Sequence, residues 1–280
     1  KTTVASSAIA VGALTSTLTY IPTITTPGVV STHTLKFTSV GRVQIGGEIT
    51  MQFASGEKWD MPSAPSVTFV GSSTVTANDA ATSWAYATNK LTIKTATAAI
   101  AAGEQIELTV AEARSAADTQ AASTVTVQTL SPDSKTIDEK TTVASSAIAV
   151  GTLGADLTYL PTTATPGVES THTLKFKTVG RVQSGGKVTM QFPAGEDWEM
   201  AVTPDVAFAP AIGSVTVAAT EWASDTRTLT VTTGVDAIPS AQQVIMTVGS
   251  VRTPSDSQLV SAVTVQTLSP DSKTIDEKTT

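Results

Sequence analysis

Cysteine is absent from the 280 residues, histidine occurs only twice, and aromatic residues make up 5% of the chain. Without cysteine the chain has no disulfide framework, no thiolate metal site and no cysteine nucleophile. Two histidines leave little for a zinc site, because structural zinc is held by cysteine and histidine ligands. We therefore predict a protein that is not an enzyme and that holds neither a metal nor another cofactor.

Basic charge and long hydrophobic runs are also scarce. The chain has 17 lysine and arginine residues against 24 aspartate and glutamate residues, which gives a net charge of −7. It lacks the basic surface that neutralises nucleic-acid phosphates, so we expect no nucleic-acid partner. The longest apolar stretches, such as residues 98–102, are far shorter than the ~20 residues that cross a bilayer. No membrane span is expected.

The sequence is an internal repeat. KTTVASSAIAVG begins at Lys1 and again at Lys140, and KTT stands once more at residues 278–280. VTVQTLSPDSKTIDEKTT is identical at residues 125–142 and 263–280. This period is much longer than that of solenoid repeats, roughly 20–50 residues, so each copy is predicted to be a complete domain. We predict one domain at residues 1–139 and a second at 140–280, ending with the first residues of a further repeat.

Alternation of apolar and polar residues predicts β-strands. In STHTLKF, the side chains of His33, Leu35 and Phe37 fall on one face, and residues 170–176 repeat the pattern. Turn signals separate such segments, as in GG at residues 46–47, and no stretch shows a sustained helical period. We predict an all-β protein of two tandem antiparallel, immunoglobulin-like β-sandwich domains, arranged as beads on a string. One barrel per repeat is the alternative.

Large apolar side chains stand at matching places in the two copies. Trp59 and Trp198 follow Gly-Glu loops, which allows a place either in the core or on a contact surface. The predicted core anchors are Phe37, Phe53, Trp84, Phe176, Phe192 and Trp222.

The histidines and the acidic residues are the remaining candidates for chemistry. His33 and His172 lie on the apolar face of a predicted strand, and no GxSxG motif accompanies them, which favours buried structural histidines over catalytic bases. Asp133, Asp138 and Glu139 lie near the repeat boundary, with Asp271, Asp276 and Glu277 as the second set, and a calcium ion shared between domains is one interpretation. Solvated loop charge is the other, because no DxDxDG loop is present.

The segment that joins the copies carries the assembly signal. TLSPDSKTIDEKTTVASSAIAV contains one proline and no glycine, unlike a flexible linker, so a structured connection is expected. Contact between the end of one repeat and the start of the next is heterologous and builds an open filament. We expect residues 4–11, or the strands at 125–130 and 263–268, to complete a neighbouring sheet by strand addition. The candidate junction residues are Val4, Ile9, Val11, Val125, Val127, Leu130, Pro132, Asp133, Lys135, Ile137, Asp138, Glu139, Lys140, Val143, Ile148 and Val150.

STHTLKF, GGKVTMQFPAGEDW and TLTVTT resemble segments of the tandem immunoglobulin-like or fibronectin-like repeats of large extracellular surface, adhesive and filament proteins. The resemblance implies an extracellular or cell-surface location and a structural or adhesive role. The predicted function is a structural repeat unit of an extracellular fibre, filament or cell-surface appendage, assembled head-to-tail with copies of itself. The alternative is an adhesin stalk or binding module that projects a ligand-binding tip, with surface glycans as partners.

Overall fold

The computed structural model describes residues 8–71, 74–209, 212, 214–259 and 261–279, without the side chains of residues 16 and 17. The described chain is all-β, as predicted, with two short 3-10 helices, η1 (Asp79–Ala81) and η2 (Tyr86–Thr88). Residue contacts divide it into two units. The first unit comprises the described parts of residues 1–24, 30–115 and 121–147, and the second those of residues 25–29, 116–120 and 148–280.

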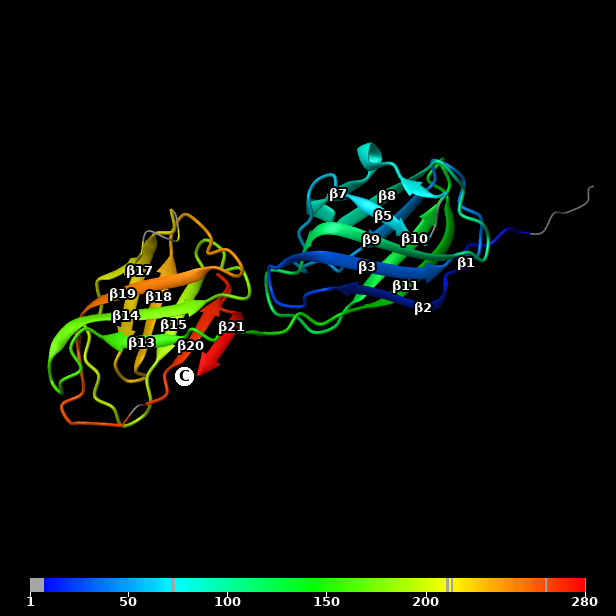
Figure 1. Ribbon diagram of the computed structural model, residues 1–280. Coiled ribbons are helices and arrows are strands. Elements are labelled where there is room, and N and C mark those ends of the chain that lie inside the picture. The colour runs from blue at the N-terminus through cyan, green and yellow to red at the C-terminus, as the bar shows by residue number, and fades with distance from the viewer. Residues whose placement is uncertain (1–7, 72–73, 210–211, 213, 260, 280) are drawn as a thin grey trace, which may run out of the picture. The chain divides into compact units, whose positions relative to one another are not determined.

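The strands of the first unit form one ladder (Figure 1). Its order is β5-β9-β3-β2-β11-β10-β4-β8-β6, with β1 paired to β11 and β7 paired to β8. Among the described strands the ladder ends at β5 and β6, which lie close together but are not paired by hydrogen bonds, so the ladder is not closed as it is in a hydrogen-bonded barrel. The strands are β1 (Gly12–Ala13), β2 (Thr15–Pro22), β3 (Val30–Thr38), β4 (Glu48–Gln52), β5 (Val67–Val70), β6 (Thr76–Ala77), β7 (Ser83–Ala85), β8 (Lys90–Ala96), β9 (Gln105–Arg114), β10 (Thr124–Leu130) and β11 (Thr136–Ser145).

The second unit has two sheets, β12-β21-β20-β15-β18-β17 and β13-β14-β19-β16. Phe176 of β14 and Met190 of β15 belong to one hydrophobic cluster, so the two sheets enclose a common core. The strands are β12 (Gly151–Thr152), β13 (Thr158–Pro161), β14 (Glu169–Lys177), β15 (Lys187–Gln191), β16 (Val206–Phe208), β17 (Val217–Ala223), β18 (Thr228–Thr233), β19 (Gln243–Arg252), β20 (Thr264–Leu268) and β21 (Thr274–Thr279).

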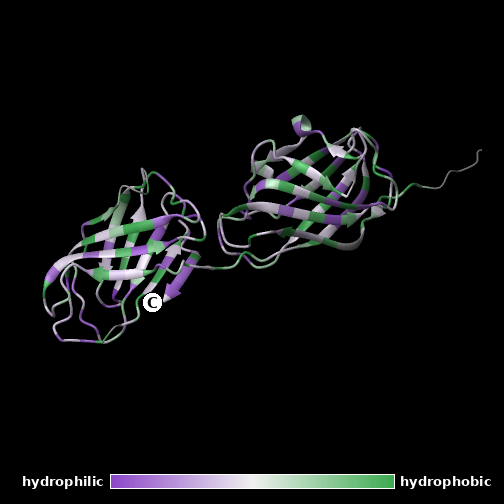
Figure 2. Cartoon of the chain, in the orientation of Figure 1, coloured by the Kyte–Doolittle hydropathy of each residue, from purple (hydrophilic) through white to green (hydrophobic). Residues whose placement is uncertain are grey.

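Alternating side chains build both cores. In β3, His33, Leu35 and Phe37 are fully buried while Thr32 and Lys36 are exposed, which confirms the predicted alternation. Figure 2 shows hydrophobic and hydrophilic residues alternating along the strands of both units. The predicted anchors lie in the cores, each with at most 7% of its surface exposed: Phe37, Phe53, Trp84, Phe176, Phe192 and Trp222.

Strand β11 runs across the boundary between the two sequence repeats. It follows a tight turn in which the Ser131 amide donates to the Lys135 carbonyl oxygen at 2.8 Å. From Thr136 the strand continues without interruption to Ser145. The domain limit predicted between residues 139 and 140 therefore falls inside a strand, and the contacts that define the first unit extend to residue 147. The opening residues of the second repeat complete the sheet of the first unit.

Candidate assembly site

The predicted junction residues fall into buried and exposed sets. Val125, Val127, Leu130, Val143 and Ile148 are buried. Asp138 is also buried, and Ile137 and Glu139 are half-buried. The exposed set is Ile9, Val11, Pro132, Asp133, Lys135, Lys140 and Val150, and Val4 lies outside the described residues.

The strands that end each repeat offer no free edge. β10 pairs with β11 on one side and β4 on the other, and β20 lies in the same way between β21 and β15. The expectation that residues 125–130 or 263–268 add to a neighbouring sheet is therefore wrong, because both of their edges are already hydrogen-bonded.

Asp138 fixes the loop that follows β3. Its carboxylate accepts hydrogen bonds from the Gly41 amide at 2.9 Å and the Val40 amide at 3.1 Å, and from the Thr129 hydroxyl at 3.1 Å. Glycine is required at position 12, because a Cβ there would collide with Asp138 Oδ1. A fully buried carboxylate is tolerated here because several donors surround it. The sequence placed Asp138 at the junction but not in this role.

Asp276 repeats the arrangement in the second unit. It accepts hydrogen bonds from the amides of Gly180 at 2.9 Å and Val179 at 3.2 Å. Burial raises the pKa of Asp276, while the hydrogen bonds from Gly180, Val179 and Thr267 act in the opposite direction. The carboxylates of Asp138 and Asp276 thus bind backbone amides of their own units, and Asp133 is exposed in the turn. This geometry favours loop capping over the shared calcium site.

The end of β11 closes the first unit over Tyr20. Ala144 pairs with Thr19 and Ser145 with Tyr20 in parallel register, so β11 joins β2 to β10. The Ser145 amide donates to the Ser123 carbonyl oxygen at 2.9 Å, and the two serine hydroxyl oxygens lie 2.8 Å apart. Beyond this strand an antiparallel bridge joins Ile148 to Gln120.

An aromatic cluster lies beneath this closure. Tyr20, His33 and Trp59 are fully buried, and their ring centroids lie 5.4–5.6 Å apart in edge-to-face arrangements. The Tyr20 hydroxyl is hydrogen-bonded to His33 Nδ1. The Trp59 indole donates to Glu57 Oε2 at 2.7 Å, and its full burial makes Trp59 a core residue and not part of a contact surface.

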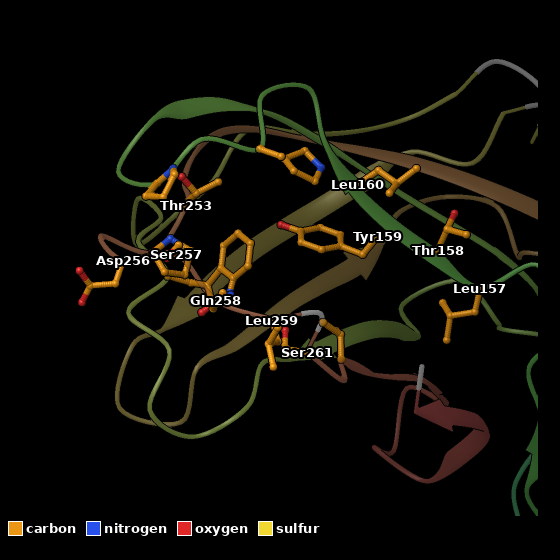
Figure 3. Close-up of a pocket in the computed structure, with 16 residues that line it drawn as sticks. Leu157, Thr158, Tyr159, Leu160, Thr253, Asp256, Ser257, Gln258, Leu259 and Ser261 are labelled. Carbon is orange, nitrogen blue, oxygen red and sulfur yellow. The ribbon is translucent and has the colours of Figure 1, made fainter.

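The second unit has a groove at the corresponding place. It has a volume of about 510 Å³ and lies between β13 and the segment before β20. Figure 3 shows Tyr159 in the middle of the groove, with Leu160 and Thr158 on one side and Gln258, Leu259 and Ser261 across from them. The lining is largely apolar, and Leu160 and Leu259 are 62% and 92% exposed. Exposed aliphatic side chains beside a groove are typical of a binding surface.

The groove is lined by counterparts of the residues that β11 contacts in the first unit. The copies align at an offset of 139 residues before Phe208 and 138 after it. Thr158 and Tyr159 therefore correspond to Thr19 and Tyr20, and Ser261 corresponds to Ser123. Among the described residues of the second unit, none takes the place that Val143–Ser145 take in the first, and β13 pairs with β14 alone.

The aromatic cluster of the second unit reflects this difference. Tyr159 and Trp198 are half-buried, whereas Tyr20 and Trp59 are fully buried. Within the described part of the chain, the Tyr159 hydroxyl and both ring nitrogens of His172 have no hydrogen-bond partner. Burial lowers the pKa of His33 and His172 to about 4 and raises the pKa of Tyr20 and Tyr159. Burial keeps both imidazole rings neutral near neutral pH, which is typical of histidines that pack in a core.

Metal-binding groups and membrane-spanning helices are absent from the described residues. They contain no group of three or more histidine, cysteine, aspartate or glutamate side chains that could hold a metal ion. No helix in the described ranges is long and apolar enough to cross a membrane. The groove in the second unit and the β11 segment in the first are the features that suggest binding.

No protein-family model matches the chain, and no curated protein sequence does. Among solved structures, a type II cohesin dyad from the adaptor scaffoldin of Acetivibrio cellulolyticus is 12% identical, with a TM-score of 0.29 and coverage of 93% of this chain and 95% of that chain. The C-terminal domain of an antigen I/II-family protein from Streptococcus pyogenes is 10% identical, with a TM-score of 0.30 and coverage of 94% and 98%.

A collagen adhesin from S. aureus is 12% identical, with a TM-score of 0.25 and coverage of 95% of this chain and 90% of that chain. TM-scores below 0.5 do not assign a fold, so the architecture rests on the strand pairing of the two units.

Proposed function

We propose that the chain is a non-enzymatic structural repeat unit of an extracellular fibre, filament or cell-surface appendage, with two tandem immunoglobulin-like β-sandwich domains assembled head-to-tail. The observation that carries this proposal is the passage of β11 across the repeat boundary. Each repeat leaves one strand position open, and in the first unit the start of the following repeat occupies it. The two surfaces involved differ, so the same contact repeated between units gives an open array.

An adhesin stalk is the second candidate, favoured by the same observation. The opening residues of the second repeat are hydrogen-bonded into the sheet of the first unit and do not form a flexible linker, which suits a stalk that projects a tip. Surface glycans are a candidate partner of a binding module, with the half-buried Trp198 beside the groove as the aromatic contact.

Electron microscopy of the native material separates these functions. A fibre unit is expected to give filaments with an axial period set by the length of one or two repeats. Dispersed short rods would support the stalk, and specific binding of this chain on a glycan array would support the binding module. Closed globular dimers would contradict the fibre proposal, because a closed dimer requires an isologous contact.

A further inference from the structure

The segment that closes the first unit has an identical copy elsewhere in the chain. VASSAIA stands at residues 143–149 and again at residues 4–10. The copy at residues 143–149 is packed in the structure, since Val143 is fully buried and Ile148 is 2% exposed. In the copy at residues 4–10, Ile9 is fully exposed, at 101% of its reference surface. The chain thus carries one VASSAIA segment that is packed and one whose isoleucine lies in solvent.

The receiving surface is duplicated in the same way. The groove of the second unit exposes Thr158, Tyr159 and Ser261, which correspond to the residues that Val143–Ser145 contact in the first unit. Tyr159 lines this groove, and its hydroxyl is buried without a hydrogen-bond partner among the described residues. An apolar groove beside the unpaired edge of β13 fits an extended peptide that adds as a strand.

We propose that Val4–Ala10 of a second copy of the chain bind as an added strand in the groove of the second unit. The proposal rests on the proposed head-to-tail function and names the partner segment. The first unit supplies the register: Ala5 pairs with Thr158 and Ser6 with Tyr159 in parallel, as Ala144 and Ser145 pair with Thr19 and Tyr20.

Two further contacts follow from the same register. The side chain of Val4 enters the core opposite Val263, because Val143 pairs with Val125. Ile9 bridges to Gln258 and leaves the solvent, because Ile148 bridges to Gln120. The inserted strand covers Tyr159 and Trp198, so both rings become as buried as Tyr20 and Trp59.

A disulfide trap tests the register, since the native chain contains no cysteine. The Oγ atoms of Ser123 and Ser145 lie 2.8 Å apart, which places their Cβ atoms within reach of a disulfide after substitution. A chain carrying Ser6→Cys is mixed with a chain carrying Ser261→Cys under mild oxidation. We expect a covalent heterodimer as the main product on a non-reducing gel.

Ala5→Cys is the matched control, because its counterpart Ala144 lies in β11 with an exposed side chain, and consecutive side chains of a strand point to opposite faces. Mixed with Ser261→Cys, it is expected to give no more heterodimer than freely diffusing thiols do. Equal yields from Ser6→Cys and Ala5→Cys would overturn the proposed register. No heterodimer from either would overturn the site.

A peptide of residues 1–12, added to the full chain, tests the segment independently of covalent capture. We expect saturable binding with a change in tryptophan fluorescence as Trp198 becomes buried. Val4→Asp in the peptide is expected to weaken binding by roughly tenfold or more, because it places a charge opposite Val263. Ala5→Asp should leave affinity within about twofold, because the corresponding Ala144 is exposed. Absence of binding would contradict the proposal.

These outcomes are distinguishable from a failure of the proposed function. Filaments in the native material, together with no trapping and no peptide binding, would retain the fibre function and reject this contact. Trapping and peptide binding without filaments would retain the contact and reject the fibre.

Discussion

Tyr20 and Tyr159 occupy equivalent positions in two units of closely similar sequence, yet only Tyr20 is fully buried. The strands around them match, and so do the histidine and tryptophan rings that they contact. The difference is the end of β11, which joins β2 in the first unit and has no described counterpart beside β13. In the first unit, the start of the second repeat therefore completes the sheet beside Tyr20.

The strand ladders show the same contrast. With β11 in place, the strands of the first unit form one ladder of eleven strands. The second unit has separate sheets of six and four strands, and β13 is four residues long where β2 has eight. The end of β11 thus joins what are two sheets in the second unit into one hydrogen-bonded ladder in the first.

The largest expected effect follows from placing a charge in the closing strand. Val143→Asp puts a carboxylate at a fully buried position, so the first unit should lose about 4 kcal/mol or more of its unfolding free energy. Urea unfolding followed by residue-resolved NMR separates the two units. Ala144→Asp is the matched control, and its exposed side chain should cost less than about 0.5 kcal/mol. Equal losses of unfolding free energy in the two variants would contradict a role for Val143 in closing the first unit.

Acid should weaken both units. The pKa of His33 and of His172 is lowered to about 4 from the ordinary 6.5, because burial disfavours the charged ring. The unfolded chain therefore takes up protons first as the pH falls. This contribution is fully present above pH 6.5 and is lost between about pH 6.5 and 4, on the order of 3 kcal/mol per histidine.

Unfolding free energies measured from pH 7 to 4 check this dependence. His172→Leu removes the titrating group from the second unit alone. The decline of that unit over this pH range should shrink while the decline of the first unit persists. An unchanged decline in the second unit would show that another group causes it.

The smallest effect concerns the tyrosine hydroxyls. Tyr20→Phe removes a buried hydrogen bond to His33 and should cost the first unit about 1 kcal/mol. Tyr159→Phe removes a buried hydroxyl that has no partner in the described chain, so it should not destabilise the second unit and should stabilise it by up to about 1 kcal/mol. Paired denaturation curves measure both values, and a larger loss for Tyr159→Phe would contradict the contrast between the two clusters.

Much of the strand pattern could be predicted from sequence because the side chains of STHTLKF alternate strictly, and β3 buries the predicted face. The sequence also predicted a structured connection after residue 130, because the joining segment has one proline and no glycine. The limit of the first unit could not be predicted from the sequence. A repeat has the same period wherever its first residue is placed, and the structural limit depends on the pairing of β11 with β2.

The site was predicted in part. Residues 4–11 were expected to add as a strand, but sequence alone did not separate them from the strands at 125–130 and 263–268, whose edges are both paired. The receiving groove was missed, since Tyr159 and Ser261 come from segments about 100 residues apart. The one available signal was the tyrosine at matching positions in both copies, each 13 residues before a histidine.

The most direct test of the account extends the full chain at its C-terminus by VASSAIAVG, the residues that follow KTT in both copies of the repeat. The extended and original chains are compared by urea unfolding and by hydrogen exchange of β13. The account expects the second unit to gain about 2 kcal/mol, comparable to the burial of one valine side chain, and the β13 amides to become protected. Identical unfolding and exchange in the two chains would contradict the claim that each unit is completed by the start of the next repeat.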